Sequence, residues 1–224
     1  MRNLKQIFQK VPTVASTLSA LNKGSNKGKK RRDEIPSFAL AEEERFQYFK
    51  EQVLMPILRT GQGRTLIVAP SYVHYVRIRN ELMRLEANAA YICEYSRDSE
   101  ISRGRSRFFH GAHDILLYSG RCHYFRRFAI RGARHVVFYS LPEYPHLYPD
   151  LVNSLSASFD AGKQQQLKQR EDNHAGGAGA AVEQAECSSL VLFSKYDKMA
   201  LERVVGQSRS SHMLKSDKAA FLFQ

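Results

Sequence analysis

Short hydrophobic runs alternate with amphipathic stretches along most of this chain. The hydrophobic runs predict strands over Thr65–Ala69, Ala89–Glu94, Asp114–Tyr118, His135–Tyr139 and Ser188–Phe193. Hydrophobic residues at helical spacing predict helices over Phe38–Leu58, Tyr72–Ala87, roughly Ser99–Gly111, Arg121–Arg131, Pro149 to about Ser156, and Tyr196–Val205. Hydrophobic strands separated by helices are typical of a parallel sheet that is buried on both faces. The pattern therefore predicts an α/β fold with helices on both faces of the sheet.

Three regions interrupt this alternation. Residues 1–34 form a basic arm, and its Gly-, Ser- and Lys-rich part predicts a flexible chain. Residues 159–184 contain runs of Gln, Gly and Ala but too few large hydrophobic residues for a core, which predicts a disordered surface insertion. Residues 206–224 form a Ser- and Lys-rich tail, whose hydrophobic end at 219–223 either docks on a partner or frays. We therefore expect the folded lobe to cover residues 35–205.

The positive charge of the chain is concentrated in two places. The 224 residues carry a net charge of +12 and a pI near 9.7. Residues 1–34 hold nine basic and two acidic residues, and residues 97–135 hold nine arginines and three acids, so that the rest of the chain has a net charge of −1. A surface that serves only solubility would intersperse its charges. The distribution favours a polyanionic partner, with RNA, DNA or an acidic protein as the candidates.

The composition also excludes several classes of protein. The three cysteines are dispersed and form no Cys-x-x-Cys pair, which argues against a disulfide framework and a zinc ribbon. No hydrophobic run approaches the roughly 20 residues that a membrane span needs, so we expect no membrane contact. The first 32 residues contain basic residues, Ser and Thr but no acid, a composition that a mitochondrial transit peptide shares.

No catalytic motif is found. An NTPase needs a Gly-rich loop after a strand that is closed by Lys and Ser or Thr, and the nearest match, 61–65, lacks the lysine and precedes a strand. Neither Gly-x-Ser-x-Gly nor His-Glu-x-x-His occurs, and His110 and His113 have no carboxylate or cysteine at metal-ligand spacing. We therefore predict no catalytic residue, no metal, no cofactor and no small-molecule substrate.

Arginines supply most candidates for contact with a polyanion. They suit phosphate because the planar guanidinium binds two oxygens at once. Arg121 follows the third strand directly, at the sheet end where ligands of parallel α/β folds gather. On the predicted helix, Arg126, Arg127 and Arg131 share one side, while Phe125 and Phe128 face the sheet. The remaining candidates from charge alone are Arg103, Arg105, Arg107, Lys29, Lys30, Arg31 and Arg32. Each could instead pair with a protein or solvate a helix, and the cluster at 29–32 also fits a nuclear localisation signal.

Several longer strings, taken in order, carry a family resemblance. They are Leu4–Gln9, Arg45–Phe49, Ala69–Asn80, Glu94–Gly111, His123–Gly132 and Phe138–Asn153. Together they resemble the C-terminal lobe of the digestive organ expansion factor family, nucleolar small-subunit processome proteins related to DEAD-box RNA helicases. The resemblance covers residues 2–158 and continues less distinctly to about 205. It implies a RecA-like lobe of the helicase second-lobe type.

The resemblance also implies roles for individual positions. Ser71, Arg77 and Arg79 lie in the matched segment that contacts the RNA backbone in helicases. Residues 119–131 stand where an active helicase links RNA to ATP, but no arginine occurs between Arg134 and Arg170, so the arginine finger is missing. The family's acidic N-terminal region and first lobe are absent here, as in a fragment of a longer protein. The match at Leu4–Gln9 favours family sequence over a transit peptide.

Three hypotheses for function follow. The first is a non-catalytic, RNA-associated component of the small-subunit processome that acts in pre-rRNA processing in the nucleolus of the nucleus. Its partners would be pre-rRNA, a guide small nucleolar RNA and other processome proteins. The alternatives are the second lobe of an ATP-dependent RNA helicase and a purely protein-binding scaffold module.

Overall fold

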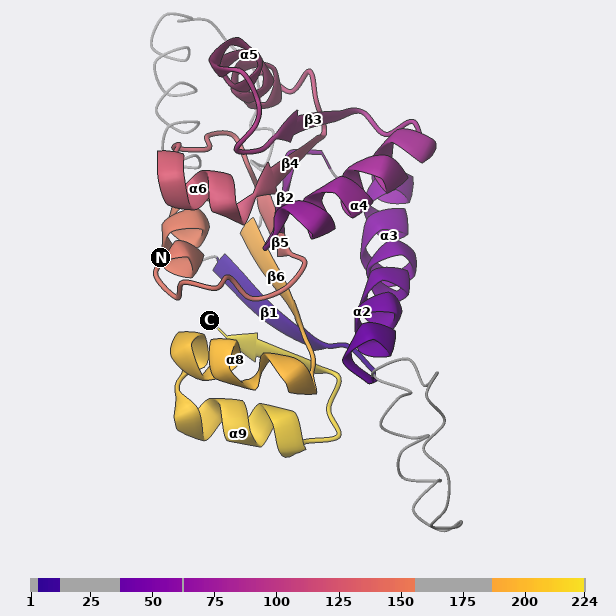
Figure 1. Ribbon diagram of the computed structural model, residues 1–224, viewed down its shortest axis with the longest axis vertical. Coiled ribbons are helices and arrows are strands. Elements are labelled where there is room, and N and C mark those ends of the chain that lie inside the picture. Colours follow the sequence, from indigo (N-terminus) through magenta and orange to yellow (C-terminus); the bar gives the residue numbers. More distant parts are fainter. Residues whose placement is uncertain (1–3, 13–36, 62, 156–186, 224) are drawn as a thin grey trace, which may run out of the picture.

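A seven-stranded sheet organises the chain (Figure 1). The computed structural model describes residues 4–12, 37–61, 63–155 and 187–223. The strands are β1 (Leu4–Lys10), β2 (Thr65–Ala69), β3 (Ala89–Ile92), β4 (Ile115–Ser119), β5 (His135–Phe138), β6 (Cys187–Phe193) and β7 (Ala220–Phe223). Their order in the sheet is β3-β4-β2-β5-β6-β1-β7. Every pair is parallel except β1 with β7, which is antiparallel.

Helices cover both faces of this sheet. They are α2 (Ser37–Tyr48), the π-helix η2 (Phe49–Leu54), α3 (Met55–Thr60), α4 (Tyr72–Arg84), α5 (Asp98–Phe109), α6 (Gly120–Arg126), a helix over 147–155, the 3-10 helix η3 (Lys195–Asp197), α8 (Lys198–Val205) and α9 (Gln207–Lys215). In Figure 1, α2, α3 and α4 lie on one side of the sheet and α6 on the other. The predicted fold class, a mostly parallel α/β sheet with helices on both faces, is confirmed.

The core consists of two hydrophobic clusters, one on each face of the sheet. Along β2, Leu66 and Val68 pack in the cluster that α5, α6, α8 and α9 cover. Their neighbours Ile67 and Ala69 pack in the cluster that α2, η2, α3 and α4 cover. Successive residues of a strand point to opposite faces of the sheet. Because helices cover both faces, all four side chains are buried. The same alternation explains why the central strands are hydrophobic throughout.

The prediction that residues 4–10 belong to a flexible arm is wrong. These residues form β1, which pairs in parallel with β6, so that Phe8 lies opposite Val191. The strand is rich in Gln and Lys, and among its side chains Phe8 is the one that is fully buried. Its stability therefore comes from pairing with segments far away in the sequence, which a local hydrophobic pattern does not show.

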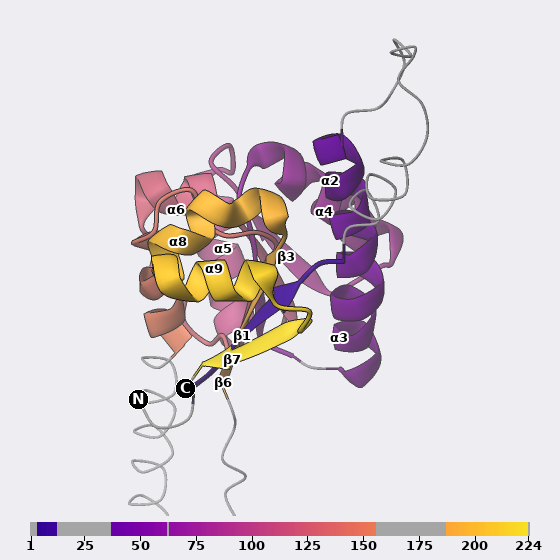
Figure 2. The same ribbon diagram turned by 90° about the horizontal axis from the view of Figure 1, so that it is seen from below.

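The C-terminal tail is also structured. Residues 207–215 form α9, which packs beside α8, and residues 220–223 form β7 at the edge of the sheet (Figure 2). Phe221 and Phe223 pack against the core, and the ring of Phe223 meets that of Phe8 at 5.3 Å. The hydrophobic end of the tail therefore docks on the chain's own β1. The predicted insertion at 159–184 lies outside the described residues.

The predicted helix over Arg121–Arg131 is wrong in its second half. The helix ends at Arg126 because Arg127 adopts the left-handed conformation, with φ 43° and ψ 43°. A left-handed residue ends a right-handed helix, and outside glycine it is too rare to be expected from sequence. Arg126, Arg127 and Arg131 therefore do not share one helix side, and Phe125 is 62% exposed instead of facing the sheet.

A buried histidine on α6 makes the fold sensitive to acid. His123 is 5% exposed, and its Nδ1 lies 3.3 Å from the hydroxyl of Tyr118. Burial lowers the pKa of His123, and burial likewise lowers that of the half-buried His135. Below about pH 6.5, the ordinary histidine pKa, the unfolded chain therefore takes up protons that the folded chain does not.

We expect the free energy of unfolding to fall as the pH drops from 7.5 to 5.5. In this window ordinary carboxylates, with pKa values of about 4, stay ionised, so the histidines dominate the change. The substitution His123→Gln should make the dependence on pH shallower, whereas Gln52→Ala, at an exposed position without a titratable group, should not. Urea denaturation across this pH range measures the effect. Equal slopes for the wild type and His123→Gln would contradict it.

Candidate nucleic-acid interface

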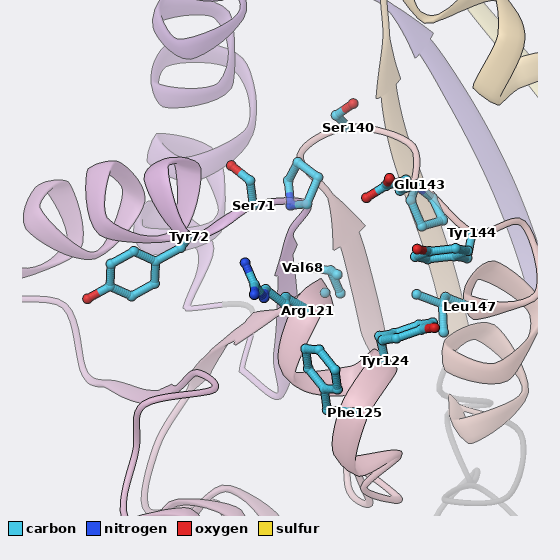
Figure 3. A pocket seen from close by; sticks show the side chains of 13 residues that line it. Val68, Ser71, Tyr72, Arg121, Tyr124, Phe125, Ser140, Glu143, Tyr144 and Leu147 are labelled. Atoms are coloured by element: carbon cyan, nitrogen blue, oxygen red, sulfur yellow. The ribbon is translucent and has the colours of Figure 1, made fainter.

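A groove opens at the carboxyl ends of β2, β4 and β5 (Figure 3). Its volume is about 330 Å³, near the lower end of the roughly 300–1,000 Å³ that ligand sites occupy. It is lined by Val68, Pro70, Ser71, Tyr72, Gly120, Arg121, Tyr124, Phe125, Ser140, Pro142, Glu143, Tyr144 and Leu147. We call it the strand-end groove. Ligands of parallel α/β sheets bind at this end of the strands, which makes the groove the candidate site.

Two strand-to-helix turns form its floor. After β2, Ser71 caps α4, and its Oγ accepts a hydrogen bond of 3.4 Å from the backbone N–H of His74. After β4, Ser119 caps α6 in the same way. A Cβ on Gly120 would lie 3.2 Å from the carbonyl oxygen of Ala69, tighter than ordinary contacts. Glycine at this position therefore lets the two turns approach closely.

Exposed aromatic rings surround the opening. Tyr72, Tyr124 and Tyr144 are each close to 40% exposed, and Phe125 is 62% exposed. The rings of Tyr124 and Tyr144 stack at 4.6 Å with an interplanar angle of 20°. Rings that remain open to solvent beside a groove offer surfaces on which nucleobases stack.

Charged side chains of both signs meet at the groove. The guanidinium of Arg121 lies 5.8 Å from the centre of the Phe125 ring, and its Nε lies 3.9 Å from a carboxylate oxygen of Glu94. Glu94 is itself held by the hydroxyl of Ser119, which donates a hydrogen bond of 2.7 Å. Because the Arg121 side chain is 60% exposed, it can exchange this long ion pair for a phosphate. Glu143 lines the groove as well.

A row of hydrogen-bonded side chains ties the groove to α2. Nδ1 of His74 lies 2.7 Å from Oγ of Ser71, and its Nε2 lies 2.9 Å from a carboxylate oxygen of Glu42. Hydrolases place a nucleophilic serine on a strained turn. Ser71 instead has relaxed extended backbone, with φ −130° and ψ 164°, and its hydroxyl caps α4. The row therefore ties Ser71, which lines the groove, to α2.

The predicted RNA-binding residues fall into four groups. Ser71 and Arg121 line the groove itself. Arg126 and Arg127 continue from Arg121 around α6 and form exposed ion pairs of 3.5 Å, with Asp98 and Asp150 respectively. Exposed pairs contribute little to stability, typically below about 1 kcal/mol, so both guanidinium groups are accessible to a phosphate.

A second group holds elements of the fold together. Arg77 pairs with Glu43 on α2 and lies 3.9 Å over the ring of Phe46. Arg105 on α5 donates a hydrogen bond of 2.9 Å to the carbonyl of Ala129, which anchors the loop after α6. Arg79 is half-buried on α4. Arg77 and Arg105 therefore make contacts within the fold, and none of the three arginines is among the residues that line the groove.

The third group is exposed and unpaired. Arg103 and Arg107 lie one turn apart on α5, and Arg131 lies in the loop before β5; within the described residues none of them has an ion pair or hydrogen bond. The fourth group, Lys29, Lys30, Arg31 and Arg32, lies outside the described residues. The structure therefore brings together Ser71, Arg121, Arg126 and Arg127 among the candidates.

The aromatic rim was missed in the sequence. Tyr72, Tyr124, Phe125 and Tyr144 were not among the candidates, although each follows closely on the end of a predicted strand. Aromatic residues at such places are a usable signal, because the carboxyl ends of parallel strands converge on the ligand site. The signal was hidden because hydrophobic residues on a helix were assigned to the core.

Across residues 4–12, 37–61, 63–155 and 187–223, no three His, Cys, Asp or Glu side chains gather closely enough to hold a metal ion. Among the helices of the same ranges, none is both long and apolar enough to cross a membrane. Cys93, Cys122 and Cys187 are all buried free thiols.

The chain is similar to known proteins over nearly its whole length. A family model described as "Utp25, C-terminal domain" matches residues 2–223. U3 small nucleolar RNA-associated protein 25 of Phaeosphaeria nodorum is 38% identical over 199 residues, which is 86% of this chain and 26% of that protein. The human homologue of that protein is 35% identical over 193 residues, 86% of this chain and 23% of the human protein. The chain thus spans about a quarter of these relatives.

Solved structures of helicases show a more distant likeness. The C-terminal domain of the DEAD-box protein Dbp5 has a TM-score of 0.47 and 12% identity, covering 74% of this chain and 77% of that one. The RNA helicase Prp28 from Chaetomium thermophilum has a TM-score of 0.49 and 11% identity, covering 74% of this chain and 34% of that one. Because both TM-scores are below 0.5, these likenesses carry no weight, and the fold class rests on the strand order and register of the sheet.

Proposed function

The chain belongs to the Utp25 C-terminal domain family, and from this membership we propose that it is a non-catalytic, RNA-associated component of the small-subunit processome. Utp25 is also known as digestive organ expansion factor, so the family expected from the sequence is confirmed. The proposed role is in pre-rRNA processing and small-subunit biogenesis in the nucleolus. The name of the relatives, U3 small nucleolar RNA-associated protein 25, supports a U3-containing particle as the place of action.

The strand-end groove is the observation that carries the proposal. It combines exposed aromatic rings with Arg121, and the accessible guanidinium groups of Arg126 and Arg127 come from the last residue of α6 and the residue directly after it. A surface that binds single-stranded RNA combines aromatic rings, on which bases stack, with cations, which bind the phosphates. The non-catalytic part rests on the sequence, which lacks a phosphate-binding loop and an arginine finger.

Removing the three groove-side arginines should weaken RNA binding. We expect the triple variant Arg121→Ala, Arg126→Ala, Arg127→Ala to bind single-stranded RNA about 100-fold more weakly than the wild type. The slope of the logarithm of affinity against the logarithm of salt concentration should also become shallower by up to about 2. Each phosphate contact with a single strand contributes about 0.7 to this slope. Fluorescence anisotropy at several salt concentrations measures both quantities.

A charge-matched control separates the groove from general charge. Arg59, Arg203 and Lys215 are exposed on α3, α8 and α9, and replacing all three by alanine removes the same charge. An equal loss in both triple variants would contradict a specific role of the groove. In cells, ultraviolet crosslinking should recover pre-rRNA or its guide small nucleolar RNA. Few crosslinked reads from a nucleolar protein would instead favour the protein-binding scaffold.

A further inference from the structure

The strand-end groove contains a carboxylate that binding of phosphate does not explain. Glu143 follows β5 in an exposed loop, and within the described part of the chain its side chain has no ion pair or hydrogen bond. It is the one carboxylate among the lining side chains. A carboxylate repels phosphate and accepts hydrogen bonds from N–H donors. At Glu143 the groove therefore disfavours the phosphates of an RNA backbone and favours the N–H donors of a base.

The aromatic rings differ in how far they are available for stacking. Tyr124 and Tyr144 stack on each other, which occupies one face of each ring. Phe125 meets Tyr124 edge to face, at 5.2 Å and 81°, and remains the most exposed of the rim side chains. With the guanidinium of Arg121 5.8 Å from its centre, the ring of Phe125 is therefore the most exposed stacking surface of the groove and lies beside its cation.

The two sides of the groove carry complementary groups. Figure 3 shows Arg121 and Phe125 on one side, with Glu143 and Tyr144 on the other and the carboxylate pointing toward the space between them. A nucleotide laid across this space would have its phosphate at Arg121, its ring on Phe125 and its base edge toward Glu143. The volume of about 330 Å³ suits one nucleotide turned out of its strand, not a duplex.

The donor pattern of the base edge selects among the four bases. A carboxylate has two oxygens and accepts two parallel hydrogen bonds best. On the Watson–Crick edge, guanine offers an adjacent imino N–H and an amino group, whereas each of the other bases offers a single donor group. We propose that the strand-end groove binds one unpaired guanine of a single-stranded RNA, read by Glu143 and stacked on Phe125. This inference rests on the proposed function, because it names the RNA feature that the same site takes.

The test uses eight-nucleotide RNAs of uridines with one central guanosine, inosine or adenosine. Inosine lacks only the amino group, so we expect the full chain to bind the guanosine RNA about tenfold more tightly than the inosine RNA. Glu143→Gln should bring this ratio close to one, even if loss of the negative charge raises affinity for every RNA. Glu51→Gln, at an exposed position on η2, should leave the ratio unchanged. Phe125→Ala should weaken both RNAs by a similar factor of about ten.

The outcomes separate this inference from the proposed function. Binding of all three RNAs with equal affinity would overturn the guanine site and leave RNA binding intact. Absence of binding to any RNA would overturn both. The preference should vanish when the guanosine is paired in a duplex. If guanosine monophosphate competes at the concentration at which the RNA binds, the site takes a free nucleotide, and the assignment to RNA is overturned.

Discussion

Replacing Phe8 by alanine should lower the free energy of unfolding by about 3–5 kcal/mol, the usual cost of emptying a buried aromatic site. Phe8 is 2% exposed in the middle of β1. Its ring meets Phe223 edge to face at 5.3 Å and Tyr148 at 5.9 Å, so it joins β1, β7 and the helix over 147–155. A side chain in a flexible arm would have no such effect.

An exposed phenylalanine supplies the matched control. Phe38 on α2 is 61% exposed, and Phe38→Ala should change the free energy of unfolding by no more than about 0.5 kcal/mol. Urea denaturation followed by circular dichroism compares both variants with the wild type. Similar small losses for the two substitutions would mean that β1 does not belong to the cooperative fold.

The central strands could be predicted because their signal is local. β2 and β4 are buried at every position, which requires continuous hydrophobic runs that are visible in the sequence. β1 has no such run, and the short hydrophobic run of β7 was not predicted as a strand. Both strands depend on pairing with residues roughly 180 or more positions away in the sequence. What the local pattern lacks is the identity of the pairing partner.

The candidate site was predictable in part for a related reason. Ser71, indicated by the family resemblance, and Arg121, indicated by its position after β4, both line the strand-end groove. Phe125 was misassigned although it lies within α6, because the buried side of this helix carries Cys122 and His123 and leaves Phe125 62% exposed. The end of the helix at Arg126 was missed because the left-handed conformation of Arg127 is too rare outside glycine to be expected from sequence.

A buried ion pair behind the groove should be the second most sensitive point of the fold. Arg45 on α2 is 2% exposed. Its Nη2 donates hydrogen bonds to Asp197 at 2.5 Å and to Oγ of Ser194 at 2.9 Å. Asp197 also accepts hydrogen bonds from the backbone N–H of Ser194, at 2.7 Å, and from the hydroxyl of Ser140, at 3.3 Å. The pair therefore connects α2, the segment after β6 and the groove-lining Ser140.

We expect Arg45→Ala to lower the free energy of unfolding by about 3–5 kcal/mol, because it leaves the Asp197 carboxylate, whose side chain is only 15% exposed, without its counter-charge. Adding Asp197→Asn should recover part of this loss, since the double variant no longer buries an unpaired charge. Arg59→Ala, at an exposed position on α3, is the control and should cost less than about 1 kcal/mol. Urea denaturation of the wild type, Arg45→Ala, Asp197→Asn and the double variant gives the coupling energy directly.

The same substitution tests whether the network positions the groove. Ser140 lines the groove and hydrogen-bonds to Asp197, so loss of Arg45 should loosen the loop that carries Glu143. We therefore expect Arg45→Ala, under conditions where it is still folded, to reduce the preference for the guanosine RNA over the inosine RNA. Arg59→Ala should leave that preference unchanged. An unaltered preference in folded Arg45→Ala would mean that the ion pair stabilises the lobe without shaping its binding site.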